Sequence, residues 1–202
     1  MITSQVKFRT PSHWLFSKER AGGGILSWLG CHYLDMLAYL LEDEVESVSA
    51  EIATLSGEAI DVEDVATVSM RFRRGTLATL TAGYLLATSV KGYSGAAYST
   101  HIALYGPQGR VEWSPWDSNS LTVESVSPEW ASAPRRQIAV DLPESPAYGG
   151  VHGEEFVRRF LRASEGDGDS PAGLDAGLHV LRLLDAIYRS AADGARAYLA
   201  DK

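Results

Sequence analysis

The stretch ATVSMRFRRG, residues 66–75, is the clearest strand in the sequence and decides the class of fold. Its apolar and polar side chains alternate, which is the period of a strand with one buried face and one open face. The apolar set is Ala66, Val68, Met70 and Phe72, and the polar set is Thr67, Ser69 and Arg71. Arg73, Arg74 and Gly75 then predict a hairpin turn, in which glycine can take a positive φ angle. The stretch therefore predicts an antiparallel sheet that buries one face.

The sequence on either side of this stretch predicts further strands and helices, and together they form an α+β pattern. Alternating residues predict strands over 4–9, 45–55, 76–86, 100–105, 110–113, 121–126 and 137–142. Apolar residues at spacings of three and four predict helices over 25–41, 153–163 and 174–192. Because no helices separate the strands, we expect an open, predominantly antiparallel β-sheet with helices packed on one face. The other face of the sheet is expected either to be exposed to solvent or to pair with a second copy of the chain in a homodimer.

The bulk composition fits one compact domain and excludes several classes of protein. The 202 residues, 45% of them apolar, are expected to form a single α+β domain over 1–202. The one cysteine, Cys31, rules out a disulfide within the chain and points to the reducing cytoplasm. A net charge of −8 argues against a nucleic-acid partner. No apolar run reaches the roughly 18 residues of a membrane span, so no membrane partner is expected.

A phosphate-binding loop for a dinucleotide is missing from the sequence. Such a site needs a strand, the spacing Gly-x-Gly-x-x-Gly and a helix, so that backbone amides can approach a pyrophosphate. The triplet Gly22-Gly23-Gly24 follows a charged segment and not a hydrophobic strand. We therefore expect the chain to bind no cofactor on its own. No metal is expected either, because the five histidines are too scattered to form a ligand pattern.

One face of the helix predicted over 25–41 carries the candidate catalytic residues. Residues three or four apart share a face of a helix, and this stripe consists of Trp28, His32, Asp35 and Tyr39. A carboxylate beside an imidazole can fix its tautomer and raise its basicity. His32 and Asp35 are therefore a candidate general acid/base unit. The alternative is a buried histidine whose hydrogen bond is satisfied by a local carboxylate.

The segment GGGILSWLGCHYLD, residues 22–35, resembles the signature of the glucose–fructose oxidoreductase, inositol dehydrogenase and MocA (Gfo/Idh/MocA) family. That signature is a glycine triplet, an apolar pair, an Asp-x-Gly-x-His-x-x-Asp core and an apolar helix. Weaker resemblances over 45–50, 63–68 and 186–194 extend it to nearly the whole chain.

The resemblance implies a two-part enzyme of which this chain is the C-terminal part. In the family, an N-terminal Rossmann domain binds NAD or NADP and supplies a lysine in a Glu-Lys-Pro motif, which this sequence lacks. The C-terminal α+β domain supplies a histidine, shapes the substrate pocket and often pairs through its open sheet. By the resemblance, His32 matches the catalytic histidine and Asp35 matches the second aspartate, which is structural as often as catalytic. The implied substrate is a sugar, a cyclic polyol or a related carbonyl.

Trp28 departs from the family pattern, because it stands where the first aspartate is expected. An indole cannot accept a hydrogen bond or a proton from a hydroxyl. If the family's aspartate orients the histidine or the substrate, this chain either lacks that interaction or makes it in another way. Trp28 can instead offer a stacking face to a sugar ring. The alternative is an aromatic side chain that packs on Gly24 or the sheet.

Further substrate-binding candidates lie in two loops. His13 and Trp14 come shortly before the glycine triplet and can border the same pocket. Lys91, Tyr93 and Tyr98 lie in a loop over 88–100, and loops over a sheet edge often line pockets. Aromatic and hydroxyl groups suit polyol substrates. The alternative for this loop is a mobile or interface segment.

Two functions from different classes remain open at the level of sequence. The leading hypothesis is the substrate-binding and dimerisation domain of an NAD(P)-dependent oxidoreductase, which needs a Rossmann domain from the same polypeptide or a separate chain. The alternative is a free-standing, non-catalytic binding or scaffold protein of the same fold, which Trp28 motivates. A lyase or hydrolase on this scaffold is a weaker third possibility. The substrate, the choice of NAD or NADP, and dimer or tetramer stay open.

Overall fold

The computed structural model describes residues 2–5, 14–55, 57, 59–83, 97–114 and 120–200. The chain divides into two compact units, and each is described by itself. Unit 1 consists of residues 1–103, 114–118 and 180–202, and unit 2 consists of residues 104–113 and 119–179. The single domain expected over the whole chain stays a prediction.

Unit 1 is built on a six-stranded sheet with the strand order β10-β2-β3-β4-β1-β5. The strands are β1 (Ile2–Gln5), β2 (Val45–Ala53), β3 (Val65–Phe72), β4 (Leu77–Gly83), β5 (Ala97–Thr100) and β10 (Ala197–Tyr198). Neighbouring strands pair antiparallel except β1 and β4, which are parallel. The sheet is thus predominantly antiparallel, as the alternating sequence predicts.

Strand β3 has the two faces that its sequence predicts. Val68 and Phe72 are completely buried, whereas Thr67 and Arg71 on the other face are exposed. The hairpin turn follows at residues 73–75, where Gly75 has a φ angle of 93°. A positive φ angle of this size is readily adopted only by glycine, so the turn depends on this residue.

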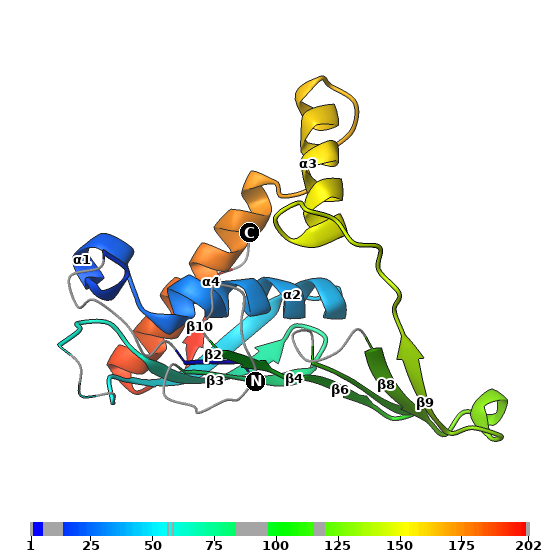
Figure 1. Cartoon of the computed structure of the whole chain (residues 1–202). Coiled ribbons are helices and arrows are strands. Elements are labelled where there is room, and N and C mark those ends of the chain that lie inside the picture. The colour runs from blue at the N-terminus through cyan, green and yellow to red at the C-terminus, as the bar shows by residue number, and fades with distance from the viewer. Residues whose placement is uncertain are drawn as a thin grey trace. The chain divides into compact units, whose positions relative to one another are not determined.

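Helices cover the buried face of this sheet (Figure 1). The short helices η1 (Trp14–Phe16) and α1 (Lys18–Ala21) lead to the glycine triplet, the π-helix η2 (Leu26–Gly30) and α2 (Cys31–Leu41). Helix α4 (Leu174–Asp193) begins in unit 2 and belongs to unit 1 from Val180 onward. The core joins both helices to the sheet, and its largest completely buried apolar side chains are Phe72, Ile25, Leu26, Leu34, Leu183, Ile187, Val45, Val48 and Val68.

The helix predicted over 25–41 is present, but its first turn is a π-helix and not an α-helix. A single π turn places one extra residue in the helix, and such turns are frequent at functional sites. The prediction assumed 3.6 residues per turn, and apolar spacing does not reveal a local π turn. Trp28 lies in this π turn and packs against buried residues of the core.

By length and composition alone, the segment from Lys18 to Leu41 is long and apolar enough to cross a membrane. This test of composition averages hydropathy over a window of residues, and no uninterrupted apolar run reaches that length. The segment is interrupted by the bends at the glycine triplet, and Ile25, Leu26 and Leu34 are buried in the core of unit 1. A core helix of a folded unit passes the same test of composition. The cytoplasmic location expected from composition stays a prediction.

Unit 2 contains a four-stranded sheet with the strand order β6-β7-β8-β9. The strands are β6 (Ile102–Gly106), which starts in unit 1, β7 (Gly109–Trp113), β8 (Ser120–Ser125) and β9 (Arg135–Ala139). The unit also holds the 3-10 helix η3 (Pro128–Trp130), helix α3 (Gly150–Ser164) and the first turns of α4. The α+β class is confirmed, with the strands divided between two sheets.

Candidate functional site

Helix α2, which carries the predicted catalytic residues, continues the π-helix η2, and the combined helix starts at a close approach between the glycine triplet and the rest of unit 1. A Cβ atom on Gly24 would overlap the backbone carbonyl oxygen of Glu63, and one on Gly23 would overlap the hydroxyl of Tyr188. A side chain is therefore excluded at Gly24, and one at Gly23 would have to displace the Tyr188 hydroxyl. Within this chain, the triplet serves to bring the helix start against Glu63, just before strand β3.

The carboxylate of Glu63 binds the N-terminus of this helix. Its Oε2 accepts a hydrogen bond of 2.8 Å from the Gly24 N–H, and its Oε1 accepts one of 3.0 Å from the Leu26 N–H. The Glu63 carbonyl oxygen accepts a third, of 3.1 Å, from the Ile25 N–H. These amides have no partner within the helix, and a carboxylate also complements the positive end of the helix dipole. Glu63 is only 6% exposed, so the contact is shielded from water.

Tyr188 of helix α4 completes this contact. Its hydroxyl donates a 2.8 Å hydrogen bond to Glu63 Oε1 and lies 2.9 Å from Ser27 Oγ. Burial raises the pKa of the Tyr188 hydroxyl, and the charge of Glu63 raises it further. Three distant parts of the sequence, at residues 23–27, 63 and 188, therefore form one buried hydrogen-bonded cluster.

The other end of helix α2 is bound by the turn that follows strand β3. The guanidinium of Arg74 donates hydrogen bonds to the carbonyl oxygens of Leu41 and Glu42, which are unsatisfied at the end of a helix. A positive charge also complements the C-terminal end of the helix dipole. The Arg74 N–H donates a 3.0 Å hydrogen bond to Asp43 Oδ2, which fixes the turn against the same end of the helix.

Residues next to strand β3 therefore hold the combined helix of η2 and α2 at both ends. Glu63 lies two residues before the strand and Arg74 two residues after it, and each carries the charge that its end of the helix prefers. The helix is fixed along its length and around its axis. Any side chain on its exposed face is accordingly held in a defined place.

The exposed face of helix α2 carries His32, Asp35 and Tyr39, and all three side chains are solvent-exposed. No hydrogen bond or ion pair joins the His32 imidazole to the Asp35 carboxylate, both of which belong to the described part of the chain. His32 is thus not a buried histidine satisfied by a carboxylate. Its ring is open to a substrate hydroxyl, and Asp35 is close enough in sequence to share its face.

Two neighbours of His32 lie on other faces of the helix. Trp28 is partly buried and packs against the core, which is the packing alternative considered for it. The Cys31 thiol points back to the helix, with its sulfur 3.8 Å from the carbonyl oxygen of Trp28. Burial raises the pKa of Cys31, so its thiol stays protonated and is a poor nucleophile.

The remaining predicted site residues are placed only in part. Trp14 lies in η1 and is 47% exposed. Tyr98 lies in strand β5 and not in a loop, which corrects the extent of the loop predicted over 88–100. His13, Lys91 and Tyr93 lie outside the described residues. The roles suggested for these residues in substrate binding stay predictions.

The helix start does not fit a dinucleotide. A pyrophosphate would need the N–H groups of Gly24 and Leu26, and the buried carboxylate of Glu63 already accepts both. The negative charge of Glu63 would also repel a phosphate group. Among the described residues, no three His, Cys, Asp or Glu side chains are grouped to hold a metal ion.

Sequence reasoning missed Glu63, Tyr188 and Arg74 as the residues that position this helix. Glu63 and Tyr188 are separated by 125 residues, and no periodic pattern links them. One signal was present in the glycine triplet, since two consecutive helix-start glycines indicate a close approach of another backbone. Glu63, two residues before strand β3, was a candidate hydrogen-bond acceptor for the amides of that helix start.

A family model described as the GFO/IDH/MocA C-terminal domain matches residues 1–112 of the chain. The matched part includes the glycine triplet, His32, Glu63 and Arg74. No curated protein sequence matches the chain.

Solved structures share this fold over essentially the whole chain. A levoglucosan dehydrogenase in complex with NADH and levoglucosan aligns with 100% of this chain and 58% of its own, with a TM-score of 0.77 and 24% identity. An oxidoreductase domain protein from Kribbella flavida aligns with 99% and 57%, with a TM-score of 0.81 and 21% identity. The WlbA dehydrogenase from Bordetella pertussis, in complex with NADH and UDP-GlcNAcA, aligns with 100% and 56%, with a TM-score of 0.72 and 25% identity. The chain thus spans a little over half the length of these structures.

Proposed function

This chain belongs to the GFO/IDH/MocA family as a C-terminal domain, and on that premise we propose that it is the substrate-binding and dimerisation part of an NAD(P)-dependent oxidoreductase. The substrate is a sugar, a cyclic polyol or a related carbonyl compound. Hydride transfer requires a Rossmann domain, supplied by the same polypeptide or by a separate chain. The similarity to dehydrogenases whose structures contain NADH, and in two cases levoglucosan or UDP-GlcNAcA, supports this proposal.

The observation that carries the proposal is the exposed position of His32 on a helix bound at both ends. A group that transfers protons must reach the substrate within hydrogen-bond distance and keep that geometry. The contacts of Glu63 and Arg74 with the ends of α2 give His32 such a fixed place. An exposed histidine on a loosely held helix would offer the same chemistry without the positioning.

His32 is the proton-transfer residue in this proposal. Oxidation of an alcohol to a carbonyl removes a hydride from carbon and a proton from oxygen. A neutral imidazole nitrogen of His32 accepts the hydroxyl proton, and the imidazolium returns it in the reverse reaction. Asp35 stabilises the imidazolium charge from the next turn of the helix. The hydride acceptor binds in the other domain.

Trp28 distinguishes this chain from the signature it otherwise follows, because no carboxylate stands at its position. The half-buried indole has a rigid place against the core. In the proposed function, its accessible edge contributes apolar contact to a sugar ring and not a hydrogen bond. His13, Trp14, Lys91, Tyr93 and Tyr98 are the further residues proposed to contact the substrate.

The open face of the unit 1 sheet is the proposed dimer surface. Its central residues are small or β-branched, since Ser49, Ser69 and Thr79 lie in one cross-strand row and Thr67 and Thr81 in the next. A flat face of this kind can meet the same face of a second copy about a two-fold axis. The pairing would cover a face that the helices leave open.

Binding of neutral sugars and cyclic polyols tests the proposal. The chain is titrated with levoglucosan, glucose and myo-inositol while the imidazole proton resonances of its histidines are followed. We expect saturable shifts of the His32 resonance, and their loss in His32→Asn. The matched control is His152→Asn, which removes a histidine of helix α3 in unit 2 and is expected to leave binding unchanged. Binding that persists in His32→Asn, or no binding at all, contradicts the proposal.

The second candidate is a non-catalytic binding protein of the same fold, and the position of Trp28 favours it. With Trp28 packed on the core and no carboxylate bonded to His32, the stripe lacks the first aspartate of the family signature. The two candidates differ in the reading frame upstream of Met1. A Gly-x-Gly-x-x-Gly motif and a Glu-Lys-Pro motif in that frame favour the enzyme, and a stop codon directly upstream favours the binding protein or a partner subunit.

A further inference from the structure

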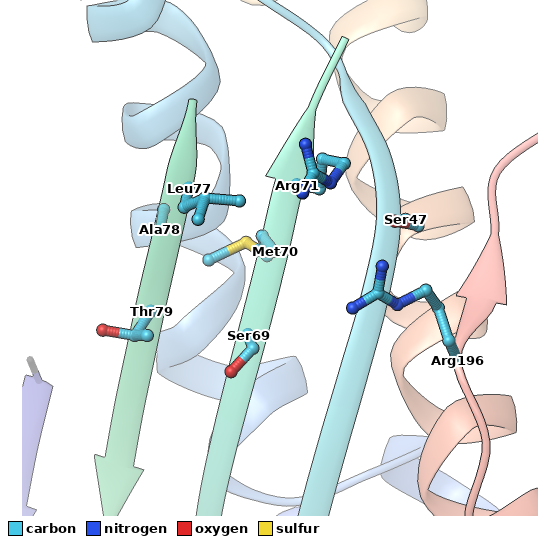
Figure 2. Close-up of a pocket in the computed structure, with 8 residues that line it drawn as sticks. All are labelled: Ser47, Ser69, Met70, Arg71, Leu77, Ala78, Thr79 and Arg196. Atoms are coloured by element: carbon cyan, nitrogen blue, oxygen red, sulfur yellow. The ribbon is translucent and has the colours of Figure 1, made fainter. Parts of the chain in front are cut away.

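Strand β4 has a partner strand along its whole length on one side and only at its end on the other. On the first side it pairs with β3 over residues 77–83 (Figure 2 shows this part of β4 beside β3). On the second side, among the described residues, it pairs with β1 only at Ala82 and Gly83. No described strand pairs with residues 77–80 there, so their backbone forms a free edge of the sheet.

A hollow lies beside this free edge, within unit 1. Its volume is about 60 Å³, whereas sites for small molecules usually measure about 300–1,000 Å³, so it suits one side chain and not a separate ligand. Strand β4 forms one wall, the start of β6 forms another, and helix α2 forms the third. The described residues that line it carry no charge and are Tyr33, Met36, Leu37, Leu40, Thr79, Leu80, Ile102 and Ala103.

The register of β1 shows what would lie along the free edge. Ile2 lies opposite Ala82 of β4 and opposite Thr100 of β5. Because β1 is parallel to β4, each step before Ile2 moves one residue back along β4. Because β1 is antiparallel to β5, the same step moves one residue forward from Thr100. A strand that continued β1 backward would therefore run between β4 and the start of β6.

This continuation leads into the hollow. The second residue before Ile2 would lie between Leu80 and Ile102. The third would lie between Thr79 and Ala103. These two pairs are the strand residues that line the hollow, so its position and its width are those of a missing strand.

The two faces of the sheet specify which side chain would enter the hollow. Residues directly opposite each other on neighbouring strands point to the same face. Leu80 is 2% exposed on the face that the helices cover, so the second residue before Ile2 would point toward α2. The residues on either side of it would point to the open face. An apolar residue is therefore required at the second position before Ile2.

We propose that β1 is the last part of a longer strand, and that the residues directly before it in the complete polypeptide fill this hollow. By the register, five residues before Ile2 reach the start of β4 at Leu77. The inference rests on the proposed function, because this polypeptide is the one that carries the Rossmann domain. It deepens that function by assigning the Rossmann domain to the same polypeptide and not to a separate chain.

A strand of a separate chain is the competing occupant. Such a strand would have to run parallel to β4 and end where β1 begins, because β1 lies on the same line between its neighbours. A continuous backbone meets this condition directly. A separate strand would also lose translational and rotational freedom on binding, and the contact of one side chain in a small hollow offsets little of that loss.

Two extensions of the whole chain, equal in composition, test the proposal. The first places Thr-Val-Thr-Val-Thr directly before Ile2, in place of Met1 and after a start methionine, so that valine takes the second position. The control places Thr-Thr-Val-Thr-Val there, which puts threonine in the hollow and the valines on the open face. Valine and threonine are similar in shape and both favour strands, so the two extensions differ in phase alone.

Amide hydrogen exchange at residues 77–80 is the main measurement. With the first extension, we expect the amides that face the free edge to exchange at least about tenfold more slowly than in the natural chain, because they gain strand partners. We also expect the midpoint of thermal unfolding to rise by at least about 2 °C. The control extension should leave both values close to those of the natural chain, since it would bury a hydroxyl without a partner.

The gene supplies a third extension. Its codons directly upstream of Met1 are added as they stand, and we expect an apolar residue at the second position before Ile2 and the same slowing of exchange. A frame that is closed directly upstream of Met1 would overturn the proposal.

Two further results would overturn it. One is exchange at residues 77–80 that is as fast with the first extension as in the natural chain. The other is equal slowing by both designed extensions, because the register would then not decide which side chain enters the hollow. The shift of the His32 resonance by sugars is measured on the natural chain, so failure of this inference is distinguishable from failure of the proposed function.

Discussion

Unit 1 and unit 2 differ in how much of their surface they bury. Every side chain in the buried core belongs to unit 1, and none of the described residues of unit 2 is buried. Unit 1 also contains the internal polar cluster of Glu63, Tyr188 and Ser27. The ion pairs of unit 2 lie near water, such as that between Arg158 and Glu154.

The difference indicates that more of the chain's stability comes from unit 1 than from unit 2. Folding is driven mainly by the burial of apolar surface, and exposed ion pairs add little. Helix α3 of unit 2 has an apolar stripe whose side chains are about half exposed, at Phe156, Val157, Phe160 and Leu161. A unit of this kind is expected to gain its full stability from neighbouring parts of a complete enzyme. Matched substitutions in the two units test that expectation.

The largest expected effect comes from the same leucine truncation in each unit. Leu34→Ala removes a side chain that is 1% exposed, and we expect it to lower the free energy of unfolding by about 2–5 kcal/mol. Leu161→Ala removes one that is 55% exposed, and we expect a loss of about 1 kcal/mol or less. Urea unfolding of the whole chain measures both. Equal losses would show that unit 2 buries as much as unit 1.

The next effect compares two glycines. Gly24→Ala places a Cβ against the carbonyl oxygen of Glu63, and because this backbone cannot retreat we expect a loss of about 3 kcal/mol. Gly177→Ala in helix α4 meets no atom within 4 Å, so the change is expected to stabilise by up to about 1 kcal/mol. Thermal unfolding compares the two variants. If Gly24→Ala is tolerated, the close approach at the helix start is not required.

A smaller effect is expected from removal of a glutamate in each unit. Glu63→Ala leaves two buried helix-start amides and the Tyr188 hydroxyl without their acceptor, and we expect a loss of about 2–3 kcal/mol. Glu154→Ala breaks an exposed pair with Arg158 and should leave stability unchanged within error. Amide hydrogen exchange in helix α2 is the more specific measurement. Faster exchange there in Glu63→Ala, but not in Glu154→Ala, supports the account.

The smallest expected effect is on the free energy of unfolding at alkaline pH, and it comes from Tyr188. Burial and the charge of Glu63 raise the pKa of Tyr188 above the value of about 10 that tyrosine has in an unfolded chain. The contribution of the neutral Tyr188 hydroxyl to the free energy of unfolding is fully present below about pH 10. It is lost as the pH rises toward the pKa of Tyr188 in the folded chain. The natural chain should therefore lose stability more steeply above about pH 10 than Tyr188→Phe does. Tyr148→Phe, at a residue 78% exposed in unit 2, should follow the natural chain.

Local patterns in the sequence predicted strand β3 and the longer helices but not every strand of unit 1, since β10 was not predicted and β5 lies where a loop was expected. The alternation at residues 66–72 predicted strand β3 and its two faces, and Gly75 predicted the turn that follows. The three helices were predicted within a few residues of their bounds. Patterns of this kind depend on neighbours in the sequence, and these elements are formed by such neighbours.

Contacts between distant residues could not be predicted in the same way. Alternation does not say which strands pair, so neither the parallel pair of β1 and β4 nor the second sheet was expected. For the site, His32 and Asp35 were placed correctly on one face of the helix. The residues that hold this helix, Glu63 and Arg74, became evident only from hydrogen bonds across the fold.

We propose that this chain supplies the proton-transfer half of a dehydrogenase and that dinucleotide binding belongs to another domain. Titration of the purified chain with NADH, followed by the fluorescence of the nicotinamide, tests it most directly. We expect no saturable change up to millimolar NADH, because Glu63 occupies the glycine-rich helix start. Saturable binding at micromolar NADH would contradict it and place the cofactor on this chain.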